Sequence, residues 1–158
     1  MDFKQTETQV SANRYFSSSC FNETWSHLDT NEPEISDMLA CAYASLYHWK
    51  KREDVTTDHL ITAHWLLARV YERASLTCGL RLHADKALSL ASESDTKGMS
   101  LLSAYEAQAR AFYLEGNKVD GRQFKVKGFD LLASLEPTLS SEEYGYCKED
   151  LDSIVECN

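Results

Sequence analysis

Histidine and cysteine are the residue types in this sequence best suited to metal binding or nucleophilic chemistry, and there are five of each. His59 and His64 are five residues apart, which places them about 140° from each other around a helix, whereas two histidines that share a metal are usually four residues apart. Cys41 and His48 fall on one helical face, but a single cysteine and a single histidine do not complete a zinc site. The sequence therefore predicts no metal site and no cofactor.

The motifs of the common enzyme classes are also missing from the sequence. It contains no G-x-S-x-G, no P-loop and no G-x-G-x-x-G, and no histidine follows a glutamate by three residues, as in helical di-iron proteins. The five cysteines form no C-x-x-C pair, so we expect reduced thiols rather than disulfides. From these observations we expect that the chain is not an enzyme.

Composition and charge restrict the partners that the chain could bind. At 158 residues, with 43% hydrophobic residues and a net charge of −9, it is expected to form one acidic globular domain. Only KKR at 50–52 is locally basic, which argues against nucleic acid and against anionic membrane surfaces. The sequence has no apolar run long enough to span a membrane and no apolar leader, so we expect a cytoplasmic protein.

Hydrophobic periodicity predicts about seven helices and no sheet. The clearest apolar stripe is Ile35, Met38, Ala42, Leu46 and Trp49, which has the spacing of an amphipathic helix. Only two prolines and six glycines interrupt the chain, which favours long helices over the many turns of a sheet. The expected helices span about 3–28, 33–51, 57–75, 79–93, 97–115, 118–135 and 140–156.

An internal repeat relates the third and fourth expected helices to the fifth and sixth. Moving the first pair forward by 41 residues matches bulky positions with bulky ones and small positions with small ones. Antiparallel helices can approach closely where small side chains face each other, with an aromatic residue one turn away to fill the gap. A period near 40 with two helices per unit is typical of a helical solenoid. The matched pairs are His64 with Tyr105, Ala68 with Ala109, Tyr71 with Phe112, and Ala87 with Gly128.

These helix pairs resemble the tetratricopeptide repeat (TPR). LARVY at 67–71 is similar to the signature of the first TPR helix, ADKALSL at 84–90 to that of the second, and QARAFYLEGN at 108–117 repeats the first. The chain departs from the family because RASLTC lacks the glycine of the first turn, no proline follows Leu90, and the spacing is 41 instead of the usual 34. The segments MLACAYASLYHW and AHWLLARVY also resemble small stand-alone bacterial proteins with a TPR-like fold.

The resemblance implies an all-α fold in which antiparallel hairpins stack as a right-handed TPR-like solenoid. Residues 1–158 would form one domain, with a divergent first hairpin at 1–55, repeats at 56–95 and 96–137, and a capping helix at 138–158. It also implies a protein–protein interaction module, because the first helices of TPR-like hairpins line a concave groove that binds a peptide or a partner helix.

The groove-facing positions follow from the register of the resemblance, one residue beyond the core stripe. Arg69 and Arg110 occupy equivalent places in the two repeats, and their planar guanidinium groups suit bidentate contacts with carboxylates. Alternatively, these are ordinary surface residues whose charges pair with each other across the groove. The predicted partner-binding residues are Trp65, Arg69, Arg73, Glu106, Arg110 and Tyr113, with Glu72 and Leu114 beside them.

Two other hypotheses remain open from the sequence. The first is a small-molecule sensor, in which aromatic residues of the second and third helices enclose an apolar ligand. The second is a homodimer that buries Phe16, Phe21 and Trp25 of the first helix. The aromatic residues of the sensor hypothesis are Tyr43, Tyr47, Trp49, Trp65 and Tyr71.

Overall fold

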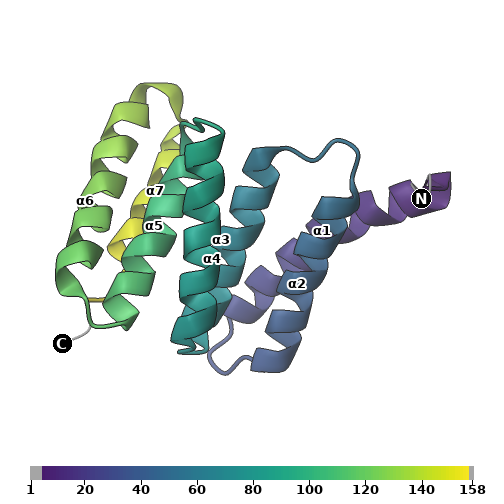
Figure 1. Ribbon diagram of the computed structural model, residues 1–158, viewed down its shortest axis with the longest axis horizontal. Coiled ribbons are helices and arrows are strands. Elements are labelled where there is room, and N and C mark those ends of the chain that lie inside the picture. Colours follow the sequence, from purple (N-terminus) through teal and green to yellow (C-terminus); the bar gives the residue numbers. More distant parts are fainter. Residues whose placement is uncertain (1–4, 157–158) are drawn as a thin grey trace.

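The computed structural model describes residues 5–156, and in this range the protein is helical without any strand. Seven α-helices and one 3₁₀ turn follow one another along the chain, which confirms the predicted all-α class and the number of helices (Figure 1). The helices are α1 (Glu7–Leu28), α2 (Ile35–Lys51), α3 (Thr57–Arg73), α4 (Thr77–Glu93), α5 (Met99–Leu114), α6 (Lys118–Leu135) and α7 (Ser141–Asp152), with the 3₁₀ turn η1 at Glu136–Thr138.

The helix ends follow the capping signals of the sequence. Thr56 and Ser140 accept a hydrogen bond from the backbone at the starts of α3 and α7, and Asn117 does so at the start of α6, as expected for N-cap residues. α1 is one continuous helix, although serines 17–19 interrupt its apolar residues, and the Ser17 hydroxyl donates to the Arg14 carbonyl within this helix. The predicted start of this helix at residue 3, and Cys157, lie outside the described residues.

Helices that are consecutive in the chain pack against each other, and α3 also packs against α5. In Figure 1, α1 and α2 lie at one end of the molecule and α6 at the other, with α3, α4 and α5 between them and α7 behind α5 and α6. None of the helices in residues 5–156 is long and apolar enough to cross a lipid bilayer.

The size of the core side chains differs along the row of helices. Large residues such as Met38, Leu66 and Leu67 fill the space between α2 and α3, and Leu102, Leu132 and Leu151 fill the space among α5, α6 and α7. Alanines dominate the contact of α3, α4 and α5 between these two regions. Small side chains leave little between the helix backbones, so these three helices can approach closely. The buried alanines at this contact are Ala68, Ala84, Ala87, Ala91, Ala104, Ala107 and Ala111.

Equivalent residues of the predicted repeat make equivalent ring contacts. Tyr71 of α3 stacks on His83 of α4 with ring centroids 5.5 Å apart, and Phe112 of α5 stacks on Phe124 of α6 at 5.6 Å. The positions of each pair are displaced by 41 residues, which is the predicted period. The α3–α4 and α5–α6 hairpins therefore repeat the same packing of a ring from the first helix on a ring from the second.

Candidate functional site

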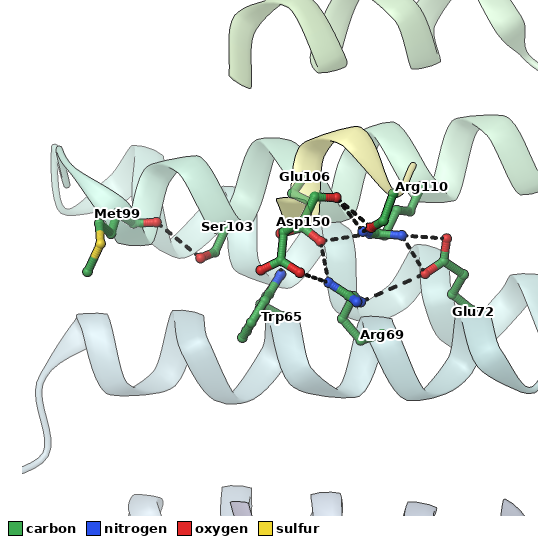
Figure 2. A network of polar contacts seen from close by, with 9 residues as sticks. Trp65, Arg69, Glu72, Met99, Ser103, Glu106, Arg110 and Asp150 are labelled. Atoms are coloured by element: carbon green, nitrogen blue, oxygen red, sulfur yellow. Dashed lines mark hydrogen bonds and ion pairs between the residues drawn. The ribbon is translucent and has the colours of Figure 1, made fainter. Parts of the chain in front are cut away.

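Five of the eight groove-facing residues expected from the sequence meet in one network of polar contacts. Figure 2 shows this network between α3 and α5, with a contribution from α7. It consists of Trp65, Arg69 and Glu72 from α3, Glu106 and Arg110 from α5, and Asp150 and Ser153 from the C-terminal segment.

Glu106 is the centre of this network and is only 3% exposed. Its Oε2 accepts a hydrogen bond of 2.8 Å from the Trp65 indole Nε1. Its Oε1 accepts from Arg69 Nη1 at 2.8 Å and from Arg110 Nε at 2.7 Å. A buried carboxylate is costly unless it is paired and hydrogen-bonded, and these three donors satisfy that requirement.

Arg110 joins the three helices. Its Nη1 donates to both carboxylate oxygens of Glu72, at 3.0 and 2.9 Å, which is a bifurcated contact. Its Nη2 donates to the Asp150 carbonyl at 2.8 Å and to the Ser153 hydroxyl at 2.7 Å. With 4% of its surface exposed, Arg110 directs its donors to Glu72, Glu106, Asp150 and Ser153 within the protein.

Negative charge exceeds positive charge in the network, which contains two arginines and three carboxylates. Arg69 Nη1 donates to Asp150 Oδ1 at 2.8 Å. Burial and the nearby charge of Glu106 nevertheless raise the pKa of Asp150, because the positive charge of Arg69 offsets only part of this increase. Burial disfavours the charged form of Arg69, but the charges of Glu106 and Asp150 outweigh it and raise the pKa of the guanidinium group.

Two hollows lie on either side of this network. The first has a volume of about 310 Å³ and lies between α3, α5 and α7. The second has a volume of about 450 Å³ and lies between α1, α3, α5 and the chain that follows α7. The first is lined by Thr62, Trp65, Met99, Ser100, Leu102, Ser103, Glu106, Glu143, Tyr146, Cys147 and Asp150.

The remaining predicted groove residues lie elsewhere. Arg73 is at the rim of the second hollow and donates to the Thr30 and Asn31 carbonyls in the loop between α1 and α2. Tyr113 is 1% exposed and packs in the core beside Gly121 of α6. Because a partner could not reach this ring without separating the helices, we leave Tyr113 out of the proposal below. Leu114 packs against the alanine contact of α3, α4 and α5.

Asp150 and Ser153 are network residues that the sequence analysis did not identify. The available signal was an aspartate within the apolar stripe of the last helix, where Cys147 precedes it by three residues and Ile154 follows it by four. A charged residue on the buried face of a helix needs a partner of opposite charge.

The other candidate residues do not form a common site. His59 bonds to Thr56 at the start of α3 and stacks on Trp49 at 4.1 Å. His48 contacts Asn13 through its Nδ1 at 2.8 Å. The aromatic residues of the sensor hypothesis divide among separate places: Tyr43 contacts Tyr71, Trp65 packs on Trp25, and Trp49 lines a hollow of about 250 Å³ between α1, α2 and α3.

Comparisons of the chain with models of protein families, with curated proteins and with solved structures each found no match.

Proposed function

We propose that this protein is a cytoplasmic protein–protein interaction module with a TPR-like arrangement of hairpins, and that it binds a basic, apolar peptide segment of a partner protein. The segment would occupy the first hollow, between α3, α5 and α7. The observation that carries the proposal is the lining of this hollow, in which three carboxylates accompany apolar side chains and no lysine or arginine is present among the described residues that line it.

The chemistry of this lining indicates the class of ligand. Glu143 and Asp150 supply negative charge, while Met99, Leu102 and Tyr146 supply apolar surface. A lysine or arginine side chain followed by an apolar residue would meet both. The negative net charge of the chain would also attract a basic segment from a distance.

The repeated packing supports the TPR-like part of the proposal. The hairpins α3–α4 and α5–α6 stack their rings in the same way, and the first helix of each hairpin lines the hollow. This is the arrangement by which TPR-like proteins bind peptides. The four described cysteines, Cys20, Cys41, Cys78 and Cys147, are free thiols, in accord with a reducing compartment.

The experiment is selection from a library of displayed peptides, followed by affinity measurement with matched variants. Tyr146 is 61% exposed and lines the hollow, whereas Tyr47 is 56% exposed and lies on α2 away from it. We expect enriched peptides to combine lysine or arginine with a large apolar residue. Tyr146→Ala should weaken their binding at least tenfold, and Tyr47→Ala should leave it unchanged.

A second variant tests the charge component of the proposal. Ser103 lies in the same hollow and is bonded only to the Met99 carbonyl of its own helix in Figure 2. Ser103→Arg would place a cation among the carboxylates and should abolish binding of basic peptides without loss of helicity. Selection of acidic peptides, or equal binding by all variants, would contradict the proposal.

The sensor hypothesis has less structural support. Its five aromatic residues do not enclose one cavity, and the hollow next to Trp49 holds only part of the set. We therefore do not propose it as a second function.

A further inference from the structure

Three side chains with metal-binding atoms face one another across the contact of α1 and α2. They are Glu23 and His27 of α1 and Cys41 of α2, and one ligand atom from each lies within 4.8 Å of the other two. None of the three lines either hollow beside the polar network. The cluster is therefore a separate feature of the molecule.

The helices fix this arrangement. Glu23 and His27 are four residues apart, so they project from the same face of α1 on successive turns. α2 packs along α1, and Cys41 lies next to Ala42, which is buried in this contact. Glu23 is exposed, and His27 and Cys41 are half-buried, so a metal ion could enter from solvent.

We infer that Glu23, His27 and Cys41 form a binding site for a thiophilic divalent cation, with Zn²⁺ as the best fit. A thiolate, an imidazole and a carboxylate are all common zinc ligands, whereas Mg²⁺ and Ca²⁺ favour sites made only of oxygen. Three protein ligands leave one tetrahedral position for water.

Binding requires a modest movement of the side chains. Donor atoms around a tetrahedral zinc ion lie roughly 3.5 Å apart, given ligand distances of about 2.0 to 2.3 Å. The present separations of up to 4.8 Å would close by rotation of the exposed Glu23 side chain and the half-buried His27 side chain. Zinc would displace the thiol proton of Cys41, and this proton would pass to solvent.

The bound ion would link the two helices of the first hairpin. Because a metal that binds the folded state alone stabilises it by mass action, Zn²⁺ should raise the melting temperature of the full chain, and Mg²⁺ at the same concentration should not. The site would therefore regulate the stability of the hairpin that contributes Trp25 to the second hollow.

The test is titration of the reduced full-length protein with Co²⁺, which reports thiolate ligation by a charge-transfer band, and then with Zn²⁺. We expect one Co²⁺ per chain, displaced by Zn²⁺. Cys41→Ser should remove the band, and His27→Gln should weaken Zn²⁺ binding at least tenfold. The matched control is Cys78→Ser, which changes an exposed cysteine on α4 and should alter neither result.

Glu23→Gln provides a variant that keeps the fold, because this side chain is exposed and changes little in volume. It should weaken Zn²⁺ binding at least fivefold while the circular dichroism of the metal-free protein stays the same. The inference is overturned if the wild-type chain gives no charge-transfer band, if Cys41→Ser retains the band, or if Zn²⁺ binds equally well to the Glu23 and His27 variants.

Discussion

The Nδ1 atoms of His64 and His83 lie 2.9 Å apart at the buried contact of α3 and α4. Two ring nitrogens this close can share one proton, with one nitrogen donating and the other accepting, but they cannot both carry a proton without conflict. The His83 Nε2 lies 3.0 Å from the Tyr43 hydroxyl, which lies 2.9 Å from the Tyr71 hydroxyl. The result is a chain of polar contacts in which at least one of the two Nδ1 atoms must be free of a proton.

Stability should fall when the pH is lowered through the range in which these histidines titrate. Burial lowers the pKa of both His64 and His83 from 6.5 to about 4. The charge of Lys50 lowers both pKa values further, and the charge of His83 also lowers that of His64. Between pH 6.5 and pH 4 the unfolded chain therefore binds more protons than the folded chain. The stability that depends on neutral histidines is fully present above pH 6.5 and is lost by pH 4. Urea unfolding at several pH values should show a loss on the order of 2 kcal/mol per histidine.

Replacement of both rings tests the origin of this effect. The double variant His64→Gln, His83→Gln retains hydrogen-bonding groups but cannot titrate, so its stability should depend less on pH between 6.5 and 4 than that of the wild type. An equally steep dependence in the variant would assign the effect to other groups.

The helices could be predicted from the sequence because the residue patterns that determine them are local. The apolar stripes that predicted seven helices act within a few residues. The period of 41 matched Tyr71 with Phe112, and the structure shows that these two residues make similar ring contacts in their hairpins. The start of α4 was missed by two residues, because Thr77 begins it after Leu76, which makes no side-chain capping bond.

The candidate sites could be predicted from the sequence only in part, because they depend on contacts between segments that are far apart in the chain. Helical register placed Arg69 and Glu106 on facing surfaces, but it could not show that Asp150 approaches the same point from α7. Two of the three residues of the proposed metal site, Glu23 and His27, have a spacing in the sequence that places them on one face of a helix. The third residue, Cys41, required the packing of α1 on α2.

Arg110→Met should strongly destabilise the protein. The substitution retains the apolar volume of the side chain but removes the cation that pairs with Glu106 and Glu72. Because Glu106 is buried, the loss should be about 3 to 5 kcal/mol in the free energy of unfolding, measured by urea denaturation.

Lys148→Met is the matched control for this measurement. Lys148 pairs with Asp152 at 2.6 Å, but both side chains are about half exposed, so removal of this ion pair should change the free energy of unfolding far less than Arg110→Met does. Similar losses for the two variants would show that burial does not determine the strength of the network.

Two glycine substitutions should have opposite effects, although both replace a helical glycine by a residue with higher helix propensity. A Cβ atom at Gly79 of α4 would overlap the Tyr71 ring, whereas a Cβ atom at Gly145 of α7 would meet nothing within 4 Å. Tyr71 cannot move freely because it stacks on His83 and bonds to Tyr43. Gly79→Ala should therefore destabilise the protein by roughly 1 to 3 kcal/mol.

Gly145→Ala should instead stabilise the protein by about 0.5 to 1 kcal/mol, because alanine loses less conformational entropy than glycine when a helix forms. Urea denaturation of both variants, followed by the near-ultraviolet circular dichroism of the tyrosines, would separate overpacking from propensity. If Gly79→Ala were as stabilising as Gly145→Ala, the Tyr71 ring could not lie as close to α4 as the structure places it. The similar contact of Tyr113 with Gly121, where a Cβ atom would lie 2.9 Å from the ring, would then be in question for the same reason.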